Sequence, residues 1–469
     1  MTLDDVIEEA RNQSQSALIA KHNFLVSYWE FRTYKAKFLP SLNLNAQLGQ
    51  YNRSLVSLQD YETGSINYVS NDNMSNSLTL SIDQNIPFTG GTVSVYTSLS
   101  RLDQFSPDND ITYNSQPINI YYSQPIKAYN SLKWEKVIEP KKFEKAKQAY
   151  LESMEVITVT VTGYFFDLLL AQGTLRMAKK SLENTKSLYD IAQERFKLGT
   201  VYKSELQQLN LRLLNDNLAV SDAELNLQMK MIKLRTYLGY NDGVDIDLVV
   251  PHIDDNLILN YEDVFYKVLE NSSFALENEI DKLLAEQAVA QARASSGLQA
   301  SLFARFGLTQ VGDKLKSAYK DPMDQEIVGL SLSLPIIDWG LGRGSVKVAK
   351  SRDRVVEEQI VQRENELKED IMFKVLQFNL QGAQCRLSAQ ADTVGRMRYE
   401  SAKERFLNGS IGVTELNTAQ TEMDDATINY LQNLSNWWSY YYTIRQLSLY
   451  DYIKGEKINE DFRKITGEN

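Results

Sequence analysis

The chain has 469 residues, about three times the usual length of one domain, so several domains or a repeated architecture are expected. Its formal net charge is −11, and Lys and Arg are scattered among Asp and Glu, which disfavours a nucleic-acid-binding surface. The single cysteine, Cys385, and the two histidines, His22 and His252, exclude a disulfide framework and leave no Cys/His cluster for a metal site or a thiol nucleophile.

Membrane insertion by helices is not indicated by the sequence. No run approaches the roughly 18 apolar residues of a transmembrane helix, and the chain does not begin with a basic, apolar segment that resembles a signal peptide. Alternating membrane strands escape such a count, so a β-barrel, or a mature chain already cleaved from its signal, is compatible with the sequence. We expect Cys385 to be a small packed residue, because free cysteines are usually buried.

In chain order, the first part of the sequence predicts a helix over residues 3–37, strands within about 41–124, and helices over about 127–196 and 203–238. The strand segments alternate strictly between apolar and uncharged polar residues, as in LNLNAQL from Leu42. Such alternation fits either a half-buried sheet or the wall of a wet membrane barrel. We favour the barrel, because the neighbouring helices are far too long to fold back over a sheet as a covering layer.

The second part of the chain repeats the first. ERFKLGTVYKSEL begins at Glu194 and ERFLNGSIGVTEL at Glu404, a separation of 210 that holds from Pro125/Pro335 to Tyr240/Tyr450 without an insertion. Helices are therefore expected over 262–296, about 341–406 and about 413–449, with strands within about 298–336. We predict two intertwined structural repeats, residues 1–250 and 251–469, whose lengths are themselves constrained.

The first copy is longer upstream of this region. Leu44 matches Leu302 at a separation of 258, so 48 additional residues lie between Gly49 and Pro125. They include LTLSIDQNIPFTGGTVSVYTSLSR, a predicted strand–turn–strand unit with the turn at Gly90–Gly91. The sequence leaves open whether this unit joins the sheet or forms an outer loop.

The long helices carry the pattern of lengthwise helix packing. In the first copy, steps of 3 and 4 join Leu175, Ala178, Leu182, Thr185, Tyr189, Ala192 and Phe196. The equivalent line in the second copy is richer in small and polar residues, so this helix either packs more closely or faces water: Cys385, Ser388, Asp392, Gly395, Tyr399, Ala402 and Phe406. We expect the aromatic stretch NWWSYYYTIRQLSLYDY, from Asn436, to pack between helices as well.

These features resemble the TolC-like outer membrane efflux proteins over essentially the whole chain. The resemblance rests on the duplicated helix–strand–strand–helix–helix order, the stretch GYFFDLLLAQ from Gly163, the two tip phrases, and LPIIDWGLGRGSV from Leu334. It implies an α+β fold in which an outer membrane β-barrel is continuous with a long α-helical coiled-coil barrel in the periplasm of a Gram-negative bacterium. It also implies a homotrimer, with 12 barrel strands if the additional unit is a loop and 18 if it joins the wall.

The two tip phrases mark helix reversals. Gly199 and Gly409 supply the positive φ of a helix C-terminal cap, and Ser204 and Thr414 are candidate caps for the returning helices. The resemblance implies that the tips contact the hairpins of a periplasmic adaptor protein through Leu198, Gly199, Thr200, Val201, Asn408, Gly409, Ser410 and Ile411. An ordinary helix turn without a partner is the alternative interpretation.

The resemblance also implies an acidic periplasmic entrance. Glu415 follows the second tip, Glu205 is its equivalent in the first copy, and Thr418 stands where a second acidic residue is usual in the family. A ring of three Glu415 side chains would attract cations and repel anions. The alternative for both glutamates is a solvated helix face.

The resulting prediction is a passive duct without cofactor or metal, the outer membrane channel of a tripartite efflux or type I secretion system. Its pump would be proton-driven (RND type) or ATP-driven (ABC type) and reached through the adaptor. A soluble coiled-coil scaffold without a pore is the competing class. An enzyme is the weakest, because the adjacent pairs Asp424/Asp425 and Asp254/Asp255 diverge on a helix and no phosphate loop or nucleophile motif accompanies them.

Overall fold

The computed structural model describes residues 1–59, 61–106, 109–240, 243–253 and 256–467. The described residues form two compact units. The first, here called the helical unit, comprises Met1–Ser27, Glu144–Glu277 and Val361–Asn469. The second, the sheet unit, comprises Tyr28–Phe143 and Asn278–Ile360.

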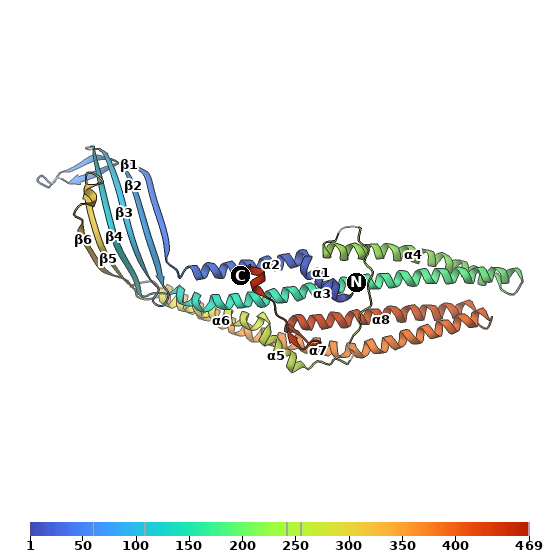
Figure 1. Cartoon of the computed structure of the whole chain (residues 1–469). Helices are drawn as coiled ribbons and strands as arrows, with labels where there is room; N and C mark the ends of the chain where they lie inside the picture. Colours follow the sequence, from blue (N-terminus) through green and yellow to red (C-terminus); the bar gives the residue numbers. More distant parts are fainter. Residues whose placement is uncertain (60, 107–108, 241–242, 254–255, 468–469) are drawn as a thin grey trace. The chain divides into compact units, whose positions relative to one another are not determined.

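The element order confirms the duplicated α+β architecture (Figure 1). The first copy consists of α1 (Leu3–Gln13), α2 (Gln15–Ala36), β1 (Ser41–Gln59), β2 (Ile66–Ile86), β3 (Gly91–Ser106), β4 (Asp110–Lys127), α3 (Ser131–Lys197) and α4 (Lys203–Leu238). The second consists of α5 (Tyr261–Asn271), α6 (Ser273–Ser295), β5 (Gln299–Gly312), the short helix η1 (Ser317–Tyr319), β6 (Met323–Ser333), α7 (Leu341–Leu407) and α8 (Val413–Ser448). The chain ends with β7 (Tyr450–Asp451), β8 (Glu456–Lys457) and α9 (Phe462–Thr466). The proposed boundary between residues 250 and 251 stays a prediction.

Two of the expected helices are interrupted, which corrects the predicted single helices over 3–37 and 262–296. The breaks fall at Ser14 and Ser272, which have extended backbones with ψ of 146° and 168°. Each serine hydroxyl accepts a hydrogen bond from the start of the following helix, at Ala17 N (3.1 Å) and Phe274 N (3.4 Å). Serine favours such caps over helix interiors, and the 258-residue separation of the two breaks shows that the interruption belongs to the repeat.

The six long strands form one antiparallel sheet in chain order, with β1 and β6 at its edges (Figure 1). The two copies join where β4 pairs with β5. The strands β2 and β3 of the additional unit pair with β1 and β4, so this unit joins the sheet and is not an outer loop. The structure thereby answers the question that the sequence left open.

The predicted alternation is confirmed along the strands. Apolar residues meet across neighbouring strands, as in Leu42–Ile82 and Leu44–Leu80, and these side chains are exposed on one face of the sheet. The opposite face is polar and internally hydrogen-bonded, because the carboxylate of Asp83 accepts from the hydroxyl of Ser94 at 2.6 Å. One exposed apolar face and one polar face is the pattern of a membrane strand whose other side is wet.

The helical unit confirms lengthwise packing, with one correction. All seven residues of the second-copy line are buried or half-buried, including Cys385 and Tyr399 at 1% exposure each. In α3 six of the seven predicted residues are buried or half-buried, and the exception is Phe196 at 40% exposure. Ser181 and Leu188 are buried in addition, because this helix packs against residues of α7 and α8 as well as against α4.

Close packing explains the small residues of the second copy. A Cβ atom added at Gly395 in α7 would lie 3.2 Å from the Cα atom of Met423 in α8. The expected packing of the aromatic stretch is also confirmed, since Trp437 and Tyr441 are 0% and 1% exposed. Of the two options for α7, the structure therefore supports closer packing over contact with water.

Among the residues that the structure describes, one helix is long and apolar enough to cross a membrane, contrary to the sequence-based expectation. α3 contains an 18-residue window of mean hydropathy 1.5. Within the chain 61% of that window is buried, which is the behaviour of a core helix. The buried residues of α3 include Phe165, Phe166 and Leu168.

Two alanine substitutions in α7 should shift stability in opposite directions. Gly395→Ala should destabilise the protein by about 1–3 kcal/mol, because its methyl group meets the backbone of α8. Gly344→Ala, where nothing lies within 4 Å, should stabilise it by up to about 1 kcal/mol through helix propensity. Thermal unfolding of the detergent-solubilised protein measures both, and equal shifts of the same sign would contradict the packing assigned to Gly395.

Candidate functional site: the hairpin tips

The α3–α4 reversal is a glycine-capped turn. Gly199 has φ of 74°, its N–H donates to Phe196 O (3.0 Å), and Thr200 N–H donates to Arg195 O (3.0 Å). This pair of bonds is the Schellman arrangement, which satisfies the last carbonyls of a helix. The expected cap at Ser204 is wrong, because α4 begins at Lys203 after Tyr202 and so takes Ser204 into its first turn.

The α7–α8 reversal has the same geometry. Gly409 has φ of 72° and donates to Phe406 O (2.9 Å), while Ser410 N–H donates to Arg405 O (2.8 Å). The expected cap at Thr414 is wrong for the same reason, since Gly412 is the N-cap residue of α8. The duplicated phrase therefore encodes one turn twice.

The structure brings the two tips together at one end of the helical unit (Figure 1). The Arg195 guanidinium at the first tip donates to Leu407 O at the second (2.7 Å). Both hairpins also contribute to a shared apolar core next to the tips: Leu188, Ala192, Leu209, Tyr399, Ala402, Phe406, Val413, Leu416 and Ala419. The two turns thus form one composite surface.

Six of the eight predicted adaptor contacts are exposed on that surface: Leu198, Gly199, Thr200, Asn408, Gly409 and Ser410. Val201 and Ile411 are half-buried and line a cavity of about 330 Å³ between the turns. Sequence reasoning missed Tyr202, which is 79% exposed beside Leu198 at 78%. The sequence contained a signal for this residue, because Tyr202 is an aromatic residue three positions after Gly199 and the equivalent position in the second copy is Gly412.

The predicted entrance residues differ between the copies. The side chain of Glu415 is 53% exposed and pairs with Arg405 at 3.3 Å, which ties the start of α8 to the end of α7. Glu205 is half-buried and lines the cavity that Arg195 also lines. Thr418 is exposed and donates its hydroxyl hydrogen to Thr414 O at 3.0 Å. The arrangement leaves Glu415 as the more accessible carboxylate.

A buried polar cluster behind the tips was not predicted. The carboxylate of Asp216 in α4 is 8% exposed, accepts from Thr185 of α3 (2.6 Å) and pairs with Arg212 (3.0 Å). Gln420 of α8 donates to Ser181 of α3 at 2.6 Å, which links the two hairpins. The signal was present in the sequence, because Asp216 stands on the buried line of α4 between Leu209 and Ala223.

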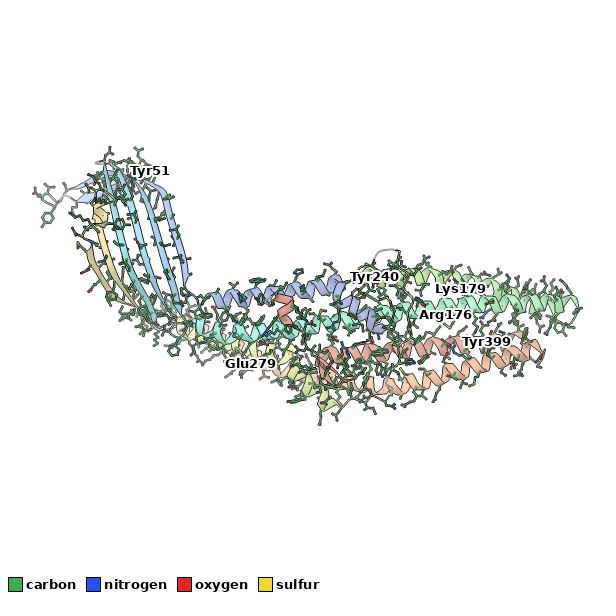
Figure 2. All side chains as sticks on the ribbon, viewed as in Figure 1. Tyr51, Arg176, Lys179, Tyr240, Glu279 and Tyr399 are labelled. Carbon is green, nitrogen blue, oxygen red and sulfur yellow. The ribbon has the colours of Figure 1, made fainter. Side chains whose placement is uncertain are left out.

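Burial shifts the protonation of two neighbours of this cluster. Burial raises the pKa of Asp424 in α8, with further contributions from Asp425 and Asp216, although Arg212 opposes the shift. Burial also raises the pKa of Tyr399 to about 12. The Tyr399 hydroxyl, labelled in Figure 2, accepts a hydrogen bond from Asn184 of α3 at 3.0 Å. A neutral tyrosine therefore sits at the seam between α3 and α7.

Across the described ranges, three or more His, Cys, Asp or Glu side chains do not gather as a metal site. Asp424 is half-buried and Asp425 is exposed, as expected for neighbours that diverge on a helix. Asp254 and Asp255 lie outside the described residues.

Comparison with known proteins gives a family and a fold. The family model described as outer membrane efflux protein matches residues 91–240 and 266–448, more than half of the chain. The search of curated proteins found no match.

Three solved structures share the fold over nearly full length. The CmeC outer membrane channel of Campylobacter jejuni is 16% identical, with a TM-score of 0.68 and coverage of 99% of this chain and 88% of that one. VceC of Vibrio cholerae is 15% identical, with a TM-score of 0.67 and coverage of 97% of each chain. The open state of the MtrE channel of Neisseria gonorrhoeae is 14% identical, with a TM-score of 0.60 and coverage of 95% and 88%.

Proposed function

The chain belongs to the outer membrane efflux protein family and is an outer membrane channel, and we propose that three copies of it form one passive duct that docks a periplasmic adaptor at its helical tips. An inner membrane pump reached through the adaptor drives transport, and the duct itself performs no covalent chemistry. The observation that carries this proposal is a pair of rows of apolar side chains, each along one helix, that are exposed to solvent in the single chain. The soluble scaffold, our alternative, has no support among the matches.

The first uncovered line lies on α4 and the second on α7. On α4, Leu211, Leu214, Leu218, Leu225 and Ile232 are 56–64% exposed and follow the 3,4 spacing of a packing seam. On α7, Phe373, Leu376, Leu380, Leu387, Val394 and Met397 are 58–65% exposed with the same spacing. Large apolar stripes of this kind mark interfaces with other chains.

The internal duplication indicates how these lines meet. At the 210-residue separation α3 corresponds to α7 and α4 to α8, and within the chain α3 packs on α8. A Cβ atom added at Gly173 of α3 would lie 3.3 Å from the Leu431 side chain. The equivalent contact, α7 on α4, is then made between two separate chains, head to tail. A repeated head-to-tail contact between chains closes a ring. The family resemblance supplies the number three, which gives six tips and an 18-stranded wall.

An engineered disulfide tests this ring. At the 210-residue separation, Gly173 corresponds to Ala383 and Leu431 to Ser221. Ala383→Cys with Ser221→Cys should therefore crosslink neighbouring chains into a closed covalent trimer. Denaturing electrophoresis after mild oxidation measures the product. Asp222→Cys in place of Ser221 points about 100° away on the helix and should crosslink far less. A monomer band from both pairs would contradict the head-to-tail interface.

Adaptor docking is supported by the exposed, duplicated tips. Six near-equivalent turns around a trimer suit the docking of a second ring, and Leu198 and Tyr202 offer apolar contacts there. A photoreactive residue at Thr200 or Ser410 should capture a periplasmic adaptor in cells. The control is Thr236, exposed at the far end of α4, which should capture none. Capture from Thr236 alone would contradict tip docking. If an adaptor is captured at the tips, its identity indicates the class of pump.

Glu415 supports a cation-preferring entrance. Three exposed Glu415 side chains near the mouth would favour cations, and each Arg405 partially offsets this charge. In lipid bilayers, Glu415→Ala should raise the small resting conductance and lower the cation preference. Arg405→Ala should instead increase that preference by a few-fold, since exposed pairs are worth up to about 1 kcal/mol. Conductance and selectivity unchanged in both variants would remove Glu415 from the entrance.

A further inference from the structure

The end of the sheet that joins the helices carries large apolar side chains in nearly full contact with solvent. Phe88 is 91% exposed, Ile336 90%, Ile337 74%, Trp339 96% and Leu341 74%. We call these five residues the basal collar. All of them belong to the sheet unit.

Hydrogen bonds hold the two parts of the collar at the same edge of the sheet. Asn130, just before α3, donates to Pro87 O at 3.1 Å, which fixes the turn that carries Phe88. The carboxylate of Asp338 accepts from the N–H groups of Gly340 and Gly342, both at 2.9 Å, which fixes the turn that carries Trp339. A Cβ atom added at Gly342 would lie 2.9 Å from Ser296, at the end of α6. Figure 1 shows α3, α6 and α7 meeting this edge.

Exposed cations lie in the chain segments that adjoin the collar. They are Lys127 at the end of β4, Lys133 and Lys136 in the first turns of α3, and Arg343 and Lys347 in the first turns of α7. Within the part of the chain that the structure describes, none of the five forms an ion pair.

The acidic side chains near α3 do not neutralise these cations. Glu135 pairs with Lys37 at 3.2 Å, and Glu139 pairs with Lys142 at 2.8 Å. Asp338 lies beside Arg343 and stays charged, because backbone N–H groups stabilise its carboxylate; it therefore offsets part of the Arg343 charge, which leaves one carboxylate against five cations. The edge therefore keeps a positive balance.

The collar continues the apolar face of the sheet. On β6 this face carries Leu330 and Leu332, which are 56% and 61% exposed, and Leu334 at 60% follows directly. In an outer membrane channel this face contacts acyl chains, so the collar lies where the hydrocarbon ends on the periplasmic side. Aromatic side chains next to lysine and arginine are the composition that membrane–water interfaces favour.

We propose that the basal collar and the five cations form a binding site for anionic glycerophospholipids of the periplasmic leaflet. Trp339 and its apolar neighbours enter the upper acyl region, while Arg343, Lys347 and the lysines bind the headgroup phosphate. Free inorganic phosphate would use the cations and leave the collar in water. The combination of both features is what favours a lipid.

Lipid retention by the intact channel tests the site. The full-length protein in detergent is titrated with phosphatidylglycerol or with phosphatidylcholine of the same acyl chains, and bound lipid is counted by native mass spectrometry. We expect a preference for phosphatidylglycerol that Arg343→Gln/Lys347→Gln lowers by roughly 5- to 25-fold, given the usual contribution of each cation near an anionic surface. Arg343→Lys/Lys347→Arg should keep the preference, as should the control Lys186→Gln/Lys282→Gln at exposed sites elsewhere on the helices.

A second measurement separates a lipid from free phosphate. Brominated phosphatidylglycerol should quench part of the tryptophan fluorescence of the wild-type protein, and Trp339→Phe should lose that part. Equal retention of the two lipids, or an unchanged preference in Arg343→Gln/Lys347→Gln, would overturn the proposal. Displacement of phosphatidylglycerol by excess inorganic phosphate, with no quenching at Trp339, would assign the cations to free phosphate and overturn it as well.

Discussion

The lengthwise packing of two equal hairpins is the constraint on which the rest of the structure depends. α3 and α7 have 67 residues each, and α4 and α8 have 36 each. One inserted residue would move everything beyond it by about 1.5 Å and turn it by about 100°, which would take side chains out of the seam. The absence of insertions between the copies keeps Phe406 in the shared core and lets Arg195 reach Leu407 O at the neighbouring tip.

Periodicity was sufficient to predict most of the fold, because long helices and alternating strands repeat a local rule many times. The tip turns were predictable for a similar reason, since the positive φ of Gly199 and Gly409 has few residue choices. Features set by tertiary neighbours were not. The break at Ser14 depends on one cap within an apolar pattern that continues across it, and the additional burial of Ser181 and Leu188 in α3 depends on contacts with other helices. Joining of the additional unit to the sheet required its pairing with β1 and β4.

Polar groups in the seams fix the register that apolar packing alone leaves loose. A line of leucines tolerates a slide of one heptad, whereas Asp216 of α4 accepts the hydrogen bond of Thr185 of α3 at one register only. Arg212 lies on α4 itself and pairs with Asp216 at any register. At the other end of the hairpins, the fully buried Glu155 binds Arg11 at 2.7 Å and Arg445 at 2.8 Å. An unpaired carboxylate at Glu155 would cost several kcal/mol, and together with the Thr185–Asp216 hydrogen bond it holds α3 against its neighbours at two levels.

The two copies have diverged where their neighbours differ. Phe166 of α3 and Leu431 of α8 are buried within the chain, at 1% and 9% exposure, whereas their copy equivalents are Leu376, which is 60% exposed, and the polar Ser221. One interface of the proposed ring thus lies within each chain and forms on folding, while the other would form only between two chains. A single chain with that second line uncovered exposes large apolar stripes to water, which favours association over the free monomer. The same duplication that gives the tips their common turn would therefore also provide the driving force for closing the proposed ring.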